Sequence, residues 1–213
     1  MGCKISVVMA SYLGEYDGCA KDRISKFHRA IESFIGQEYP YKELIIVSDG
    51  CALTISESRM YNLNTQVFIY GIDKQTVFSG NVRNYGLQKC TGDIVCYLDT
   101  DDYFGKNHLN KIAAAFSHHP DYDWIYYNDN IVYHNHPISG EKWIFSERQV
   151  NLQSGEIGTS SIAHKKMDDV NWLGCDGYGH DWIFVNKLIG LKKNYFKSIG
   201  EYYVCHIPLQ ADS

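Results

Sequence analysis

Short apolar runs alternate with amphipathic segments through the first half of the chain. Ile5 to Ala10 has the apolar character of a buried strand, and apolar residues between Ile24 and Ile35 recur every three or four positions, as on one face of a helix. We expect this helix to end at Gly36, before Pro40. The pattern predicts an α/β fold, in which helices cover the faces of a central sheet.

The alternation continues to about residue 130. It predicts further strands and helices, in chain order a strand at Leu44–Val47, a strand at Val67–Tyr70, a helix at Asn81–Gln88, a strand at Ile94–Leu98, a helix that includes Leu109 to Phe116 and ends near His118-His119-Pro120, and a strand at Trp124–Tyr127. Beyond Asn130 we expect Gly-, Ser- and His-containing loops, then a helix at Trp182–Leu191 that closes around Gly190, and a strand at Tyr202–Ile207. Because no linker or repeat is visible, we expect one domain over residues 1–213, with a sheet half (1–129) and a more irregular half (130–213).

Composition narrows the class of protein. Of 213 residues, 45% are hydrophobic and 21% are charged, which is typical of a globular chain with one sizeable core. The net charge of -5 argues against a nucleic-acid partner and against a polybasic membrane anchor. No apolar run is long enough to cross a bilayer, which leaves only peripheral membrane contact open.

The seven cysteines indicate a reducing compartment. Their number is odd, they form no C-x-x-C pair, and they follow no secretory signal peptide, so we expect a cytoplasmic protein whose cysteines are small buried hydrophobes. None is a candidate nucleophile.

Four carboxylate sites stand at the carboxyl ends of expected strands or at the starts of expected helices. They are Asp49, the cluster from Asp99 to Asp102, Asp129 and Asp181. In open α/β sheets ligands bind at the carboxyl ends of the strands. Three aspartates within four residues repel one another, and a divalent cation that prefers oxygen, Mg²⁺ or Mn²⁺, would neutralise them. The alternative is a solvated acidic turn that caps the next helix.

Other phosphate-binding signatures are missing. The chain has no G-x-x-x-x-G-K-[ST] loop and no G-x-G-x-x-G after its first strand. A diphosphate would therefore be held mainly by metal, and Arg83 could add a planar cationic donor, although a lone arginine on a helix is also typical of a surface ion pair.

Five motifs together resemble the family-two inverting glycosyltransferases with the GT-A fold. The first four have the order and spacing of that family: Ser6 to Tyr12, Ile45 to Gly50, Arg83 to Gly86, and Tyr97 to Asp102. The fifth, Gly179 to Trp182, is a looser match to the acceptor motif Glu-Asp-Trp of the family. The helix-to-strand step from His119 to Asp129 is also similar. The resemblance covers nearly the whole chain and implies a single GT-A-type domain with a mixed, mostly parallel central sheet flanked by helices.

The resemblance also implies roles in a donor site. Tyr12 would lie against the nucleobase and Asp49 would hydrogen-bond to its edge, with the other donor-site residues being Ser11, Arg83, Asn84 and Thr100. Asp99 would face the ribose. Asp101, with Asp102 nearby, would coordinate the metal, and His206 lies where relatives place a histidine near it; a buried, hydrogen-bonded histidine is the alternative.

Asp181 matches the catalytic base of the family, which takes the proton of the acceptor hydroxyl. A carboxylate at the start of an apolar helix, partly shielded by Trp182, can be tuned toward the operating pH by desolvation. Asp181 could instead be a helix N-cap. One position departs from the family, because His180 stands where a glutamate is usual, and this puts in doubt what that glutamate contributes near the acceptor.

These features predict a metal-dependent inverting transferase that moves a sugar from a nucleotide-diphosphate donor to a hydroxyl acceptor. The resemblance implies a UDP-sugar donor, a glycan or lipid-linked saccharide acceptor, and a role in polysaccharide biosynthesis, with residues 1–129 binding the donor and 130–213 the acceptor. A haloacid-dehalogenase-like phosphatase fits less well, because Tyr103 replaces its Thr or Val and the Asp-x-Asp motif lies mid-chain. The other alternative is an inactive nucleotide- or glycan-binding module. The sequence does not specify the sugar or the oligomeric state.

Overall fold

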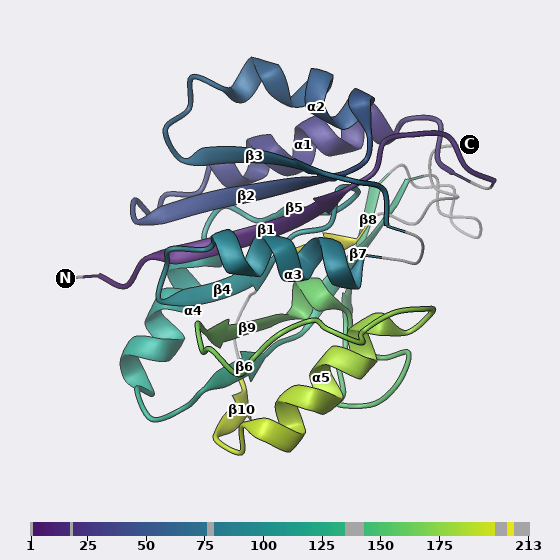
Figure 1. Cartoon of the computed structure of the whole chain (residues 1–213). Helices are drawn as coiled ribbons and strands as arrows, with labels where there is room; N and C mark the ends of the chain where they lie inside the picture. Colours follow the sequence, from purple (N-terminus) through teal and green to yellow (C-terminus); the bar gives the residue numbers. More distant parts are fainter. Residues whose placement is uncertain (1, 18, 76–78, 135–142, 199–203, 207–213) are drawn as a thin grey trace.

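The protein is described by a computed structural model that covers residues 2–17, 19–75, 79–134, 143–198 and 204–206 (Figure 1). Within these residues the strands form two sheets. The larger sheet contains β1 (Ile5–Ser11), β2 (Lys42–Asp49), β3 (Val67–Ile72), β4 (Ile94–Tyr97), β6 (Trp124–Tyr126), β9 (Ile162–Lys165) and β10 (Tyr195–Lys197). The smaller sheet contains β5 (Tyr103–Phe104), β7 (Asp129–His134), β8 (Trp143–Arg148) and β11 (Val204–His206).

The larger sheet has the order β10-β6-β9-β4-β1-β2-β3. Strand β1 pairs in parallel with β2 and β4, β2 pairs in parallel with β3, and β10 with β6. Only β9 runs against its neighbours, and it lies between β4 and β6. The mixed, mostly parallel sheet expected from the sequence is therefore confirmed.

Helices cover both faces of this sheet, as the apolar strands require. The helices are α1 (Arg23–Ile35), α2 (Ala52–Ser58), α3 (Gly80–Lys89), α4 (His108–His118) and α5 (His180–Leu191), with two short 3-10 turns, η1 (Arg59–Tyr61) and η2 (Thr159–Ser161). The sheet has a hydrophobic core on each face, and alternate residues of β1 pack into one or the other. Val7 and Met9 pack with α1 and α4, while Val8 packs on the other face with α3 and α5.

Gly86 allows α3 to lie directly on the sheet. A Cβ atom placed there would meet the side chain of Val8 at 2.6 Å and that of Val47 at 3.2 Å. Any larger residue would push α3 outward, together with Arg83 and Asn84 one turn earlier. Gly86 thus determines how close Arg83 and Asn84 come to the ends of the strands.

The expected elements of the first half are present, with ends that differ by a few residues. The expectation of loops after Asn130 was wrong, because β7, β8 and β9 are strands. They are short or belong to the second sheet, so they lack the alternation with helices that marked the first half. Helix α5 begins at His180 and contains Gly190, which therefore does not close it. Only Val204–His206 of the expected last strand is described, and it is β11.

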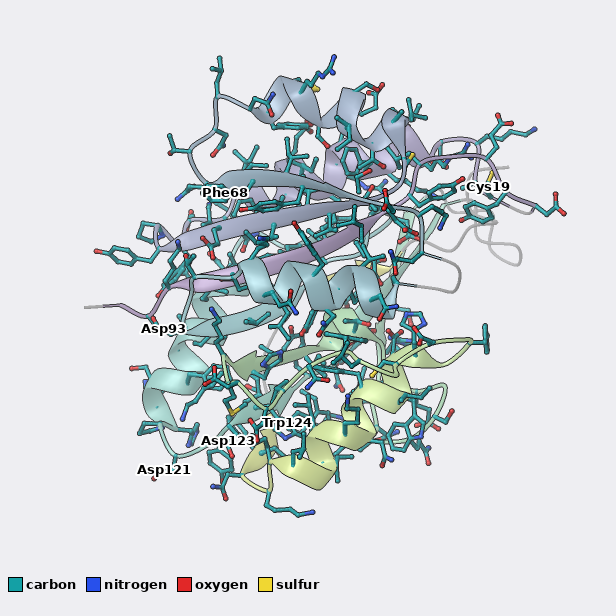
Figure 2. The ribbon with its side chains drawn as sticks, in the orientation of Figure 1. Cys19, Phe68, Asp93, Asp121, Asp123 and Trp124 are labelled. Atoms are coloured by element: carbon teal, nitrogen blue, oxygen red, sulfur yellow. The ribbon has the colours of Figure 1, made fainter. Side chains whose placement is uncertain are left out.

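Trp124 joins the second half to the sheet (Figure 2). Its side chain is fully buried, stacks on Tyr195 with ring centroids 4.4 Å apart, and donates from Nε1 to the carbonyl of Lys192 at 3.1 Å. This contact fixes the chain after α5 against β6. Among the described residues, no helix combines the length and apolarity that crossing a bilayer demands.

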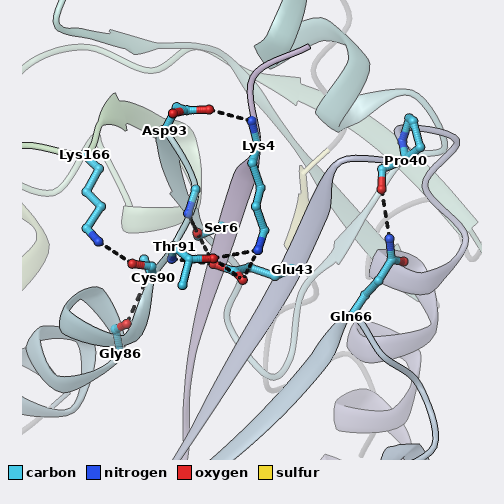
Figure 3. Close-up of polar contacts among 11 residues, drawn as sticks. Lys4, Ser6, Pro40, Glu43, Gln66, Gly86, Cys90, Thr91, Asp93 and Lys166 are labelled. Carbon is cyan, nitrogen blue, oxygen red and sulfur yellow. Dashed lines mark hydrogen bonds and ion pairs between the residues drawn. The ribbon is translucent and has the colours of Figure 1, made fainter. Parts of the chain in front are cut away.

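A buried carboxylate closes the amino-terminal end of the sheet (Figure 3). Glu43 on β2 accepts hydrogen bonds from the Ser6 hydroxyl at 2.6 Å, the Thr91 amide at 2.6 Å and the Thr91 hydroxyl at 2.8 Å, and its Oε2 lies 2.6 Å from Lys4 Nζ. Burial alone would raise the pKa of Glu43, but these donors outweigh it and lower the pKa. The network connects β1, β2 and the residues that lead into β4.

We expect Glu43→Gln to lower the free energy of unfolding by about 1–3 kcal/mol at neutral pH, because the amide leaves buried donors without an acceptor. Since the folded pKa is depressed, the stabilisation is present above the unfolded value of about 4.3 and is lost as the pH falls through the folded pKa. Denaturant unfolding at several pH values measures both effects. Glu38→Gln, at an exposed ion pair with Lys106, is the control. Equal losses in the two variants would contradict the prediction.

Candidate active site

The parallel strands bring residues that are far apart in sequence to one edge of the sheet. Ser11 ends β1, Asp49 ends β2, and Asp99 follows β4 by two residues. Because β4, β1 and β2 are parallel neighbours, their carboxyl ends lie side by side. The sequence predicted all three as donor-site residues, and the fold places them along one edge.

A pocket of about 530 Å³ lies at this edge. It is lined by Ala10, Ser11, Tyr12, Tyr16, Asp49, Lys74, Ser79 and Val82. Asp49 accepts from Lys74 Nζ at 2.5 Å and from the amide of Gln75 at 2.6 Å, and Lys74 Nζ also lies 4.4 Å from the centre of the Tyr12 ring. Lys74 was not predicted. Its position just after β3, the parallel neighbour of β2, could have indicated it.

A larger cavity, about 830 Å³, lies at the opposite end of the sheet. Its lining includes Cys3 just before β1 and Ile94 at the start of β4, so it opens at the amino ends of the strands. Ligands of open α/β sheets bind at the carboxyl ends. The smaller pocket, beside the acidic residues, is therefore the candidate site.

Arg83 is the central cation of this edge. Its guanidinium is buried, donates from Nη2 to Asp99 Oδ1 at 2.6 Å and from Nη1 to the Ser79 hydroxyl, and lies 3.6 Å from Asp181 Oδ1. Burial disfavours the charged form, but the charges of Asp99 and Asp181 outweigh it and raise the pKa of Arg83. The sequence left a surface ion pair open, and burial excludes it. Arg83 instead joins a predicted donor residue to the predicted base.

The acidic cluster after β4 divides into different environments. Asp99 pairs with Arg83, and Asp102 is buried, with Oδ2 3.3 Å from the Ser160 hydroxyl that donates to it. Thr100 and Asp101 are partly exposed. Burial raises the pKa of Tyr16, and the charge of Asp101 raises it further, so Asp101 lies near a residue that lines the pocket.

Three consecutive hydroxyls in η2 serve three different carboxylates. Thr159 donates to Asp181, Ser160 to Asp102, and Ser161 to Asp129. Asp129 is fully buried and also accepts two bonds from Arg148, from Nε at 2.7 Å and from Nη2 at 2.5 Å. Sequence reasoning missed η2. The run of three hydroxyl residues after Gly158 was the only signal for it.

Asp181 lies in the first turn of α5, where a negative charge is favourable. It is not the N-cap, because that position is Gly179, whose φ of 89° is in the left-handed region that favours glycine. Asp181 Oδ1 receives the Thr159 hydroxyl and lies 3.1 Å from His180 Nε2. Burial would raise the pKa of Asp181, but the bond from His180 and the charge of Arg83 lower it overall. The expected upward tuning by desolvation was wrong.

The remaining predicted residues have other contacts. The Ser11 hydroxyl lies 3.0 Å from that of Thr54, and Asn84 Oδ1 accepts from the amide of Trp172 at 3.0 Å. Asn84 therefore supports the chain before α5. The side chain of His206 lies outside the described residues. Its backbone lies in β11, where it follows the Cys205–Tyr103 pair with β5 and pairs with Ile131 of β7.

The acidic residues fit a divalent cation that is shared with a ligand. The described residues contain no group of three or more His, Cys, Asp or Glu that could hold a metal by themselves. Mg²⁺ is commonly held by one or two carboxylates, with phosphate oxygens and waters completing its shell. Asp101 and Asp102 offer that number of carboxylates.

The family model described as "Glycosyl transferase family 2" matches residues 19–168. This interval contains the pocket residues Asp49 and Lys74, Arg83, and the acidic cluster. The chain belongs to glycosyl transferase family 2. The resemblance inferred from the sequence is thereby confirmed, and the residues gathered by the fold belong to a glycosyltransferase.

Relatives cover this family 2 protein to different extents. The uncharacterized glycosyltransferase YwdF of Bacillus subtilis (strain 168) is 22% identical over 96% of this chain and 71% of its own length. Poly(ribitol-phosphate) beta-N-acetylglucosaminyltransferase TarS of Staphylococcus aureus (strain Mu50 / ATCC 700699) is 30% identical over 55% of this chain, which is 20% of TarS.

Solved structures confirm the GT-A fold. The crystal structure of S. aureus TarS 1-349 superposes with a TM-score of 0.70 and 16% identity, over 96% of this chain and 60% of that one. The same TarS fragment in complex with UDP-GlcNAc gives a TM-score of 0.70 at 18% identity, over 58% of its chain. The family 2 domain described here thus spans a little over half of the TarS fragment.

We expect Arg83→Gln to lower the free energy of unfolding by about 2–4 kcal/mol, because it removes the buried cation shared by two carboxylates. Chemical denaturation measures the change. Arg59→Gln, at an exposed position of η1, is the control and should stay within about 0.5 kcal/mol of wild type. If both variants are as stable as wild type, Arg83 does not hold the two carboxylates together.

Proposed function

We propose that this glycosyltransferase moves a sugar from a UDP-sugar to a hydroxyl acceptor, with inversion at the anomeric carbon and with the help of a divalent metal. The acceptor is a saccharide, free or lipid-linked. The observation that carries the proposal is the contact of one buried cation, Arg83, with Asp99 on the donor side and Asp181 at the start of α5. It brings a diphosphate-binding edge and a general base into one site.

The pocket at the carboxyl ends of β1 and β2 is the proposed nucleotide site. Tyr12 offers an aromatic face, and Asp49 offers a carboxylate held in place by Lys74. A complex of TarS with UDP is known in the same fold, which supports a uridine nucleotide here. Residues 1–129 would accordingly bind the donor and residues 130–213 the acceptor.

Asp181 is the proposed base, and its two oxygens have different roles. Thr159, His180 and Arg83 all contact Oδ1. The hydrogen bond and the two ion pairs of Asp181 thus all involve Oδ1, and Oδ2 is the oxygen that we assign to the acceptor. The acceptor oxygen attacks the anomeric carbon, its proton passes to Oδ2, and the bond to the diphosphate breaks with the electron pair leaving on the phosphate oxygen. No covalent enzyme intermediate forms.

A divalent cation would be held by Asp101 and Asp102, with His206 from β11. When bound, Mn²⁺ or Mg²⁺ supplies positive charge that stabilises the leaving diphosphate. Arg83 would add a fixed positive charge at the same edge, close to Asp99.

The function is tested with a panel of nucleotide sugars and saccharide acceptors, by measuring nucleoside diphosphate release and sugar transfer. Wild type should transfer from a UDP-sugar, and Asp181→Asn should lower kcat by about 10²–10⁴-fold with little change in donor affinity, because the amide cannot accept the proton. Asp169→Asn, at an exposed ion pair with Lys192, is the control. Donor binding without turnover by wild type would favour an inactive binding module.

Asp101→Asn should weaken metal-dependent donor binding by about 10–100-fold, since even partners of metal ligands have effects of that size. Calorimetric titration of UDP in the presence of Mn²⁺ and then of a chelator measures the change. Asp121→Asn is the control, because it removes the same charge at an exposed turn before β6 (Figure 2). Equal UDP affinity of wild type with metal and with chelator would contradict the metal requirement.

A further inference from the structure

His180 contacts the proposed base directly. Its Nε2 lies 3.1 Å from Asp181 Oδ1 and 3.2 Å from the Ser79 hydroxyl, and its Nδ1 lies 3.2 Å from the carbonyl of Gly177. The side chain is only 17% exposed. Both ring nitrogens are therefore engaged, one with the loop before α5 and the other with the site.

The partners determine what each nitrogen can do. A carbonyl only accepts, so Nδ1 must carry a proton to bond to Gly177. When the ring is neutral, Nε2 then has a lone pair and can accept from Ser79, but it donates nothing to Asp181. When the ring is charged, Nε2 donates to Asp181 Oδ1 and places a positive charge beside it.

We propose that His180 is a positioning residue that makes the base strength of Asp181 depend on pH. The charged ring holds Oδ1 and weakens the carboxylate as a base. When the ring is neutral, Asp181 has neither the positive charge nor the hydrogen bond beside it, and it then takes the acceptor proton on Oδ2 more readily. The inference rests on the proposed function, because it concerns the same proton transfer.

Three other charged groups are on the segments that contact the ring. Asp181 lies on the same helix and contacts Nε2, Arg83 on α3 donates to Ser79, and Asp176 precedes Gly177, whose carbonyl contacts Nδ1. Arg83 is held by Asp99 and does not titrate in the range where histidines do. Of the side-chain types named here, only an imidazole ordinarily changes its charge near neutral pH.

This role gives a physical meaning to the residue that departs from the family. A glutamate at this position would bring negative charge to Asp181 at neutral pH and could not donate a hydrogen bond. His180 instead supplies a removable positive charge. The expected consequence is a transferase whose turnover rises with pH in the range of histidine titration.

The test is the pH profile of kcat at saturating UDP-sugar and acceptor. Wild-type kcat should rise about tenfold between about pH 5.5 and 8, as removal of one charge beside a general base allows. His180→Gln should remove this slope, because the amide can still donate to Oδ1 but never carries charge. His180→Glu is the second variant and should remove it too. Melting temperatures confirm that the variants are folded.

His28→Gln is the matched control. His28 forms a similar pair with Glu57 at 2.9 Å and also bonds to Tyr61, away from the strand ends. It should keep the wild-type slope. A flat wild-type profile, or a wild-type slope in His180→Gln, would overturn the inference while leaving the transferase intact. Absence of transfer by wild type at every pH would overturn the proposed function and this inference together.

Discussion

The site depends on one buried positive charge. Asp99 and Asp181 come from opposite halves of the chain and would repel each other at the same edge of the sheet, and Arg83 lies between them. Gly86, one turn later on α3, lets the helix come close to the sheet, because a Cβ atom there would collide with the side chain of Val8. The motif from Arg83 to Gly86 thus provides both the buried charge and the glycine that brings the helix close to the sheet.

Residues of the second half of the chain donate hydrogen bonds to the carboxylates of the site. Three adjacent hydroxyls in η2 donate to Asp181, Asp102 and Asp129, and these bonds tie the acidic residues to one rigid turn. The three carboxylates are not equivalent, because the donors act on particular oxygens. The hydroxyl of Thr159 donates to Oδ1 of Asp181, whereas the hydroxyls of Ser160 and Ser161 donate to Oδ2 of Asp102 and of Asp129.

Much of the first half could be predicted from sequence, because parallel strands buried on both faces are apolar runs and the helices between them have clear periodicity. The same logic placed Asp49 and Asp99 at one edge. Lys74 and η2 could not be placed, since neither belongs to a periodic element and their contacts join distant segments. The expected pKa direction of Asp181 was wrong, because desolvation could be foreseen from its helix, whereas the hydrogen bond from His180 and the buried charge of Arg83 depend on the folded arrangement.

The antiparallel strand β9 has a consequence for how the molecule assembles. It lies between β4 and β6, although both precede it in the chain, so the sheet is continuous only after residue 165 has been added. Until then β4 and β6 each present an unpaired edge, which is a template for association with other chains. Residues 1–129 therefore cannot complete this sheet by themselves, and a growing chain must hold an incomplete sheet from Tyr97 to Lys165, about a third of its length, before β9 closes it.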